Sequence, residues 1–138
     1  MKNNTNFIEK LRSSGLRPTK QRLKISKVLF NRKNTFHFTI NDLFKILQKE
    51  TGEKISLATI YNTIHSFTKK GYLKEISINS EKSFFDTNTS NHHHFLDVAT
   101  NELIDLKKTD VETIKIKKNI PGKKIKSEEV LVKIENSN

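Results

Sequence analysis

The sequence predicts an α+β fold in two parts, a helical part closed by a β-hairpin and a smaller part of three strands and one helix. Apolar residues recur at helical spacing as far as Gly71, whereas short runs that alternate apolar and polar residues follow. Charge divides the chain at a similar point, because Lys and Arg exceed Asp and Glu by 16 to 5 over residues 1–79, while residues 80–138 carry 10 of each. A chain of 138 residues fits one domain or two small ones.

Two helices are expected before residue 31. Phe7 and Leu11 indicate a short first helix, which Gly15 ends. Pro18 suits the first turn of a second helix, which runs to Phe30. The second helix is rich in cations, which are Lys20, Arg22, Lys24 and Lys27. For any one of these residues a solvated helix face is a sufficient explanation.

Two further helices follow. Thr39 and Asp42 have the spacing of a capping box and predict a third helix over about 40–50, ended at Gly52. Ser56 caps a fourth helix, which Gly71 stops. The expected core residues of this helix recur at steps of three and four and are Leu57, Ile60, Ile64 and Phe67. A short connection between the third and fourth helices gives a helix-turn-helix geometry.

The outward face of the fourth helix contains no carboxylate from Ser56 to Gly71. A surface helix usually carries acids as well as bases, and a face that enters the major groove of DNA excludes acids. The small and polar residues of this face suit base edges and phosphates and are Ala58, Thr59, Tyr61, Asn62, His65 and Ser66. An ordinary polar helix face is the alternative interpretation.

A β-hairpin is expected after the fourth helix. Residues 72–78 have β-type composition, Asn79 and Ser80 make a turn, and the chain returns as a strand over residues 83–85. Helices followed by a hairpin form the winged-helix plan, in which the hairpin reaches the neighbouring backbone of bound DNA.

The second part alternates in the manner of strands. Residues 93–98 and 103–106 predict two paired strands, and residues 130–134 predict a third. Thr109 and Glu112 have capping-box spacing, which predicts a helix through about Lys118. About 50 residues bury too little surface to be stable alone, so pairing with a second copy is expected. A two-fold dimer would present two helices to a palindromic site.

Composition excludes several classes of protein. Cysteine is absent, which excludes disulfides, Cys-ligated zinc and thiol catalysis and leaves imidazole and carboxylate as metal ligands. No apolar stretch approaches the roughly 20 residues of a membrane span, and the start of the chain is polar, so a cytoplasmic protein is expected. Binding to a membrane surface is the weaker interpretation of the net charge of +11, because the cations do not oppose an apolar face.

Several motifs together resemble the ferric uptake regulator family across nearly the whole chain. They are Leu16-Arg17-Pro18-Thr19 with Gln21-Arg22, Phe38-Thr39-Ile40 with Asp42-Leu43, Leu57-Ala58-Thr59-Ile60-Tyr61-Asn62-Thr63, and His92-His93-His94. The resemblance implies a winged-helix DNA-binding domain over residues 1–87 and a small α/β dimerisation and metal-sensing domain over residues 88–138. The lack of cysteine, the His-His-His-Phe run and the ending from Ile120-Pro121-Gly122 to Ile134 are most similar to the iron response regulator branch, whose members answer to haem or iron status.

On this basis, one set of residues is expected to contact double-stranded DNA: Arg17, Thr19, Lys20, Arg22, Ser56, Ala58, Thr59, Tyr61, Asn62, His65 and Lys82. The cations position the protein on phosphates, whereas Thr59, Tyr61 and Asn62 meet base edges. His65 is interpreted as a residue of the DNA-facing surface and not as a metal ligand.

The resemblance also implies two metal sites. A junction site between the domains would use His37, Asp86 and His93, and a second site would use His92, His94, Glu112 and Glu128. Such ligands suit iron, manganese or zinc. Each has a simpler alternative: His37 could be a half-buried loop histidine, Glu112 the capping partner of Thr109, and Glu128 a solvated strand residue. The triplet His92, His93, His94 is also a candidate for haem, because an axial imidazole can hold the iron.

Two departures from the family pattern bear on these sites. Phe95 stands where the junction site normally has another His, which leaves three protein ligands and an open position. Val98 and Asn101 stand where many members carry the first Cys pair of a structural zinc site, so that site is expected to be absent.

Two functions from different classes are therefore weighed. The first is a dimeric transcription regulator that responds to metal or haem. The second is a small metalloenzyme whose three-ligand metal activates a water. The enzyme needs a general base beside the metal, and no HExxH or comparable motif supplies one. It also leaves the uneven charge unexplained, so the regulator is the preferred hypothesis.

Overall fold

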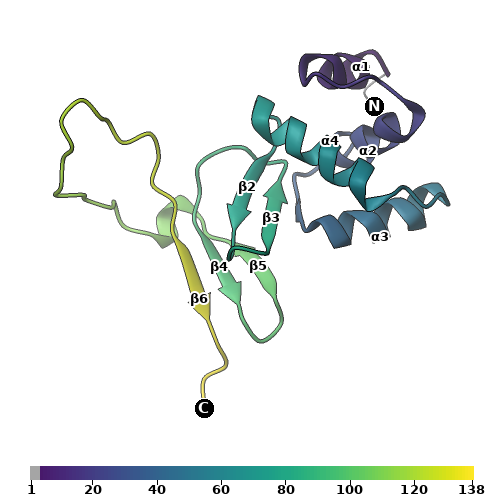
Figure 1. Ribbon diagram of the computed structural model, residues 1–138. Helices are drawn as coiled ribbons and strands as arrows, with labels where there is room; N and C mark the ends of the chain where they lie inside the picture. The colour runs from purple at the N-terminus through teal and green to yellow at the C-terminus, as the bar shows by residue number, and fades with distance from the viewer. Residues whose placement is uncertain (1–3) are drawn as a thin grey trace. The chain divides into compact units, whose positions relative to one another are not determined.

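The computed structural model describes residues 4–138, and the chain divides into two compact units, Met1–Thr89 and Ser90–Asn138 (Figure 1). The division falls two residues after the boundary expected at residue 87. Helices and strands are both present, as expected for an α+β chain. None of the described helices is long and apolar enough to cross a membrane.

Over residues 4–89, the first unit contains four helices and a three-stranded sheet. The helices are α1 (Asn4–Ser13), α2 (Lys20–Phe30), α3 (Ile40–Thr51) and α4 (Leu57–Lys70). The strands are β1 (His37–Phe38), β2 (Lys74–Ser77) and β3 (Ser83–Asp86). Both neighbours of β3 are antiparallel to it, in the order β1-β3-β2. The order of helices and then the β2–β3 hairpin confirms the predicted winged-helix plan. The sequence did not predict strand β1.

Local hydrogen bonds explain where these helices begin. Thr39 and Asp42 form both bonds of the expected capping box, each 3.1 Å long. The hydroxyl of Ser56 accepts a bond of 3.2 Å from the backbone N–H of Thr59 and so starts α4. Gly71 ends that helix at φ 96°, a left-handed conformation that favours glycine.

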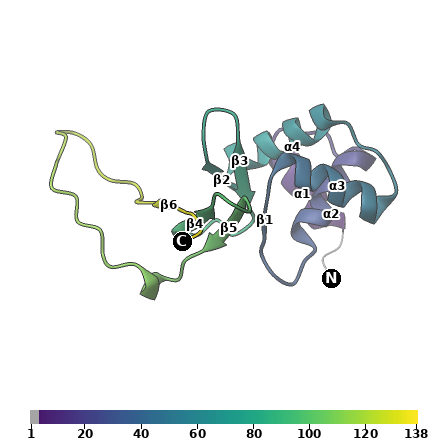
Figure 2. The ribbon, with the colours of Figure 1, turned by 90° about the horizontal axis from the view of Figure 1, so that it is seen from below.

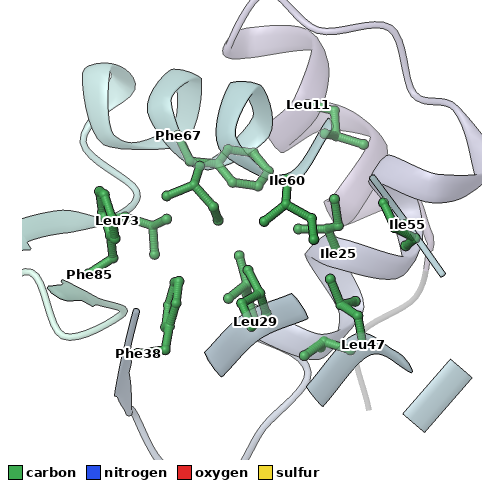
Figure 3. Packing of buried hydrophobic residues seen from close by; sticks show 13 residues of the cluster. Leu11, Ile25, Leu29, Phe38, Leu47, Ile55, Ile60, Phe67, Leu73 and Phe85 are labelled. Carbon is green, nitrogen blue, oxygen red and sulfur yellow. The ribbon is translucent and has the colours of Figure 1, made fainter. Parts of the chain in front are cut away.

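The core of the first unit lies where α2, α3 and α4 meet the sheet. Phe67 and Ile60 of α4 are fully buried, and so are Ile25 of α2 and Leu47 of α3 (Figure 3). Leu57 was expected to join them, but it is 48% exposed. It is the first residue of α4, so it lies one turn before the buried stripe that starts at Ile60.

The second unit is a three-stranded sheet in the order β5-β4-β6. Its strands are β4 (His94–Asp97), β5 (Glu102–Asp105) and β6 (Leu131–Ile134). β4 pairs antiparallel with β5 and parallel with β6. Three strands were expected, and all three are present.

The helix expected from Thr109 to Lys118 is not formed. Only a short 3-10 turn, η1 (Lys108–Asp110), is present, and residues 111–130 contain no helix or strand. The Asp110 carboxylate accepts the backbone N–H of Lys107 at 2.8 Å, in place of the expected bond between Thr109 and Glu112. The segment beyond it alternates Ile and Lys with a period of two, so it has no apolar stripe with which to pack as a helix.

Candidate nucleic-acid surface and metal centre

The side of α4 that faces away from the core is polar and free of acids. Ser56, Ala58, Asn62 and His65 are exposed, and Thr59 is half-buried. Tyr61 is 56% exposed, and its ring stacks on that of His65 with centroids 6.0 Å apart and an interplanar angle of 3°. The expected contact residues of α4 therefore lie at the surface, where a duplex can reach them.

The cations expected to meet phosphates also lie at or near the surface of the first unit. Arg17 and Lys20 are exposed, and Arg22 is half-buried, with its guanidinium donating to the backbone carbonyl of Arg17 at 3.1 Å. Thr19 is exposed, but its hydroxyl accepts the backbone N–H of Arg22 at 3.3 Å and so caps α2. Thr19 thus has a structural role that is complete without DNA.

Several acids of the first unit are engaged by other groups of the same unit. Glu53 pairs with Lys24, and Glu50 pairs with Arg32 at 3.5 Å. Glu75 accepts a 2.6 Å hydrogen bond from the hydroxyl of Ser83 across the hairpin. The two ion pairs cancel one carboxylate charge each against one cation, whereas Glu75 keeps its charge.

A cleft of about 760 Å³ lies between the start of α3, the outward face of α4 and the hairpin. Tyr61 and His65 line one side, and Lys82 of the hairpin lines another. The Asn79 side chain shapes the hairpin turn, because its oxygen accepts the backbone N–H groups of Glu81 and Lys82 at 2.8 and 3.0 Å. Lys82 is half-buried and its ammonium lies 5.5 Å from the centre of the Phe84 ring.

A compact group of metal-type ligands lies in the second unit. One donor atom from each of His92, His94 and Asp105 lies within 4.8 Å of the others. The Asp105 oxygen is 3.4 Å from Nε2 of His92 and 3.1 Å from Nε2 of His94. With metal–ligand bonds of about 2.0–2.2 Å, two ligands of one ion lie roughly 3.0–3.5 Å apart. The spacing of these three donors therefore fits a single ion.

The hydrogen bonding of His92 favours the same interpretation. Its Nδ1 lies 2.8 Å from the backbone carbonyl of Ser90, which can only accept, so Nδ1 carries the ring proton. In neutral imidazole this leaves Nε2 with a lone pair facing Asp105. A lone pair beside a carboxylate needs either a second proton or a cation between them. A carbonyl that fixes the tautomer in this way is a common support for a metal-bound histidine.

The sequence predicted only part of this group. His92 and His94 were expected in the second metal site, but their carboxylate neighbour is Asp105, which the sequence analysis missed. Glu112 and Glu128 line a cleft of about 280 Å³ with His92, yet neither belongs to the compact group of donors. Asp105 could have been found by aligning the two predicted strands as an antiparallel pair. A turn after Asp97 then places Asp105 directly opposite His94.

The three residues of the expected junction site lie in different units. In the first unit, His37 of β1 and Asp86 of β3 are cross-strand partners. Asp86 is buried, and it also pairs in register with Lys74 of β2. Burial lowers the pKa of Lys74, and the Asp86 carboxylate offsets part of that effect. In the second unit, Nδ1 of His93 accepts the backbone N–H of Val130 at 2.9 Å, so Nε2 carries the ring proton and His93 offers no lone pair to a metal in this arrangement.

Comparison with known proteins agrees with these features. The model of the ferric uptake regulator family matches residues 13–134. The peroxide-responsive repressor PerR of Staphylococcus aureus strain Mu50 is 34% identical over 98 residues, which are 71% of this chain and 64% of that protein. The chain thus spans slightly less than two thirds of the length of the curated relatives it matches.

Solved structures of regulators share the fold. The ferric uptake regulator of Vibrio cholerae is similar with a TM-score of 0.68 at 22% identity, covering 94% of this chain and 98% of that one. That of Pseudomonas aeruginosa, solved with manganese, has a TM-score of 0.67 at 21% identity, with coverage of 96% and 98%. The family match extends over most of the sequence, from the last residue of α1 to the end of β6. The chain belongs to the ferric uptake regulator family.

Proposed function

We propose that this chain is a transcription regulator of the cytoplasm that binds double-stranded DNA as a homodimer and changes its DNA affinity when it binds a divalent metal. Family membership supports a regulator and not an enzyme. The observation that carries the proposal is the acid-free, exposed face of α4 in a unit with a large excess of cations.

The DNA contact follows from the surface of the first unit. Thr59, Tyr61 and Asn62 lie near the N-terminal end of α4, where recognition helices approach base edges. Arg17, Lys20 and Lys82 supply positive charge for phosphates from α2, its preceding loop and the hairpin. Phosphate contacts fix the position of the protein, and base contacts select the sequence.

The metal would be held by His92, His94 and Asp105 in the second unit. The expected junction site of His37, Asp86 and His93 remains a separate proposal, for which Asp86 offers a buried carboxylate. His93 would have to give up its bond from Val130 to offer a lone pair there. Two imidazoles and carboxylates accept iron, manganese or zinc. A bound metal can change DNA affinity only if it binds one arrangement of the chain better than another.

Pairing with a second copy would cover apolar surface on the second unit. Phe95 lies opposite Ile104 on one side and Val132 on the other, which forms a row across the sheet. Ile104 and Val132 are each 40% exposed. A two-fold pair would place two α4 helices on a palindromic site.

Haem and the iron response regulator branch are not part of the proposal. The imidazoles of His92 and His94 both face Asp105, and His93 uses one ring nitrogen for a backbone bond. The curated relatives compared carry the name peroxide-responsive repressor instead.

The proposal is tested with full-length protein and labelled duplex DNA. Fluorescence anisotropy would be recorded across a series of salt concentrations, with Mn²⁺, Fe²⁺ or Zn²⁺ and with chelator. We expect affinity to fall steeply with salt, because phosphate contacts release counterions. The His94→Ala variant should bind less metal and lose the metal-dependent change in affinity. Binding that does not depend on salt would refute the DNA assignment, and full metal response in His94→Ala would refute the metal assignment.

A further inference from the structure

One segment of the second unit differs in composition from the rest of that unit. Residues 113–127, called the lysine arm below, contain six Lys, four Ile and no Asp or Glu. The six are Lys115, Lys117, Lys118, Lys123, Lys124 and Lys126. Residues 80–112, in contrast, hold seven acids and three Lys. The neutral balance of the second half therefore conceals two regions of opposite charge.

The lysine arm is an open loop with a defined tip. Figures 1 and 2 show it leaving η1, projecting away from the sheet of its own unit and returning to β6. At the tip, the N–H of Lys123 donates to the carbonyl of Ile120 at 3.0 Å, and Gly122 has φ 77°. Pro121 and this left-handed glycine suit the two central positions of a type II turn. The turn reverses the chain, so the arm has two limbs, and both carry cations.

The lysines of the arm are available to an outside partner. All six are exposed, and within the part of the chain that the structure describes no carboxylate pairs with any of them. In an extended limb, residues two apart lie on the same side at a separation of about 6.6 Å. Lys115 and Lys117 have this relation in the first limb, and Lys124 and Lys126 have it in the second.

Charge identifies the class of partner. A dense group of exposed ammonium groups without acids matches a polyanion, and duplex DNA carries one negative charge per about 1.7 Å of its axis. A membrane surface is less suitable, because interfacial segments pair their cations with Trp, Phe or Leu. The arm has no aromatic residue, and at most two Ile side chains lie opposite the paired lysines of either limb, which is a small apolar face for a membrane.

We propose that the lysine arm is a second DNA contact, which lies along the phosphate backbone and adds affinity without reading sequence. This inference rests on the proposed DNA-binding function and extends it to the second unit. Each phosphate neutralised contributes about 0.9 to the slope of log affinity against log salt, so full engagement of the six lysines would add roughly 5 to that slope.

The test compares three triple variants of the full chain, each with three charges removed. K115Q/K117Q/K118Q changes the first limb and K123Q/K124Q/K126Q the second. The control, K107Q/K108Q/K133Q, removes three exposed lysines of the same unit outside the arm. Affinity for a mixed-sequence duplex of about 30 base pairs, roughly three helical turns, would be measured from low to high salt. Circular dichroism and metal content would verify that each variant folds.

The expected result is a salt slope that is smaller by about 1–3 in each arm variant and unchanged in the control. Equal losses in all three variants would show an effect of net charge alone and would overturn the proposal. Unchanged slopes in the arm variants would also overturn it, and reduced binding to anionic vesicles or reduced self-association would then identify the alternative occupant. If the unaltered protein shows no salt-dependent duplex binding, the proposed function itself fails, which separates the two conclusions.

Discussion

Replacement of Ser56 separates the structural role of α4 from its proposed role at DNA. The Ser56 hydroxyl caps the helix by accepting the backbone N–H of Thr59, and its side chain is exposed. Asp and Asn cap helices about as well as Ser, so neither Ser56→Asp nor Ser56→Asn should unfold the protein. Only Ser56→Asp places a negative charge on the acid-free face.

The expected size of the effect follows from Coulomb's law. The major groove is about 12 Å wide, so we take about 7 Å as the distance from a carboxylate inside it to the nearest phosphates. In water this repulsion amounts to roughly 0.6 kcal/mol for each phosphate. Two or three phosphates therefore weaken binding by about 1–2 kcal/mol, or roughly five- to thirtyfold. The same charge should be neutral or slightly favourable for folding, because it lies at the positive end of the helix dipole.

The assay measures duplex affinity at low and high salt beside urea unfolding of each variant. Ser56→Asn should retain stability and most of the affinity, and Ser56→Asp should retain stability but lose far more affinity, with the loss shrinking as salt rises. Equal duplex affinity of the two variants at low salt would refute the assignment of this helix face to DNA. A loss of stability in Ser56→Asp would instead show that the cap is specific to serine.

Three further predictions concern the metal ligands and the framework. Asp105→Asn should lower affinity for Mn²⁺ or Zn²⁺ at least tenfold with little change in stability, measured by metal titration, because the amide keeps the shape of the carboxylate and loses its charge; unchanged affinity would exclude Asp105 as a ligand. Phe67→Ala should reduce the free energy of unfolding by about 3–5 kcal/mol, since the ring is fully buried and meets the Phe30 ring edge-on, with 5.4 Å between ring centroids. A loss below about 1 kcal/mol would contradict the described core. Gly71→Ala should cost about 1–2 kcal/mol through backbone conformation alone, because no atom lies within 4 Å of the added carbon; a stabilised variant would exclude the left-handed cap.

The helical unit could be predicted well because its signals are local. Ser56, Thr39 and Gly71 act within one turn of their own positions, so spacing alone places the helix ends. Leu57 was assigned to the core incorrectly because periodicity does not show where the buried stripe starts. β1 escaped prediction because two residues form a strand only through their partner, in this case β3.

Only the histidines of the candidate metal group could be predicted from the sequence. A run of three His is evident from the sequence alone. Asp105 comes close to two of them only because strand pairing across a turn places it opposite His94. Glu112 and Glu128 were predicted by resemblance, and their positions depend on a segment that forms no helix in this chain. A capping signal at Thr109 could not produce a helix there, because capping stabilises a helix by only about 1 kcal/mol and cannot replace a packed apolar face.

The position of Asp86 gives a physical basis for coupling metal and DNA within the first unit. Asp86 ends β3, and Ser83, which follows the hairpin turn with Lys82, begins it. The strand is four residues long, so only about 10 Å separate its ends. The buried Asp86 carboxylate lies in register between His37 and Lys74. A divalent cation bound to this carboxylate would reverse the local charge beside Lys74 and so alter the pairing of the three strands that carry the hairpin. We therefore expect Asp86→Asn to change DNA affinity in the absence of metal. If metal acts only by neutralising surface charge, Asp86→Asn without metal will bind DNA as tightly as the unaltered chain without metal.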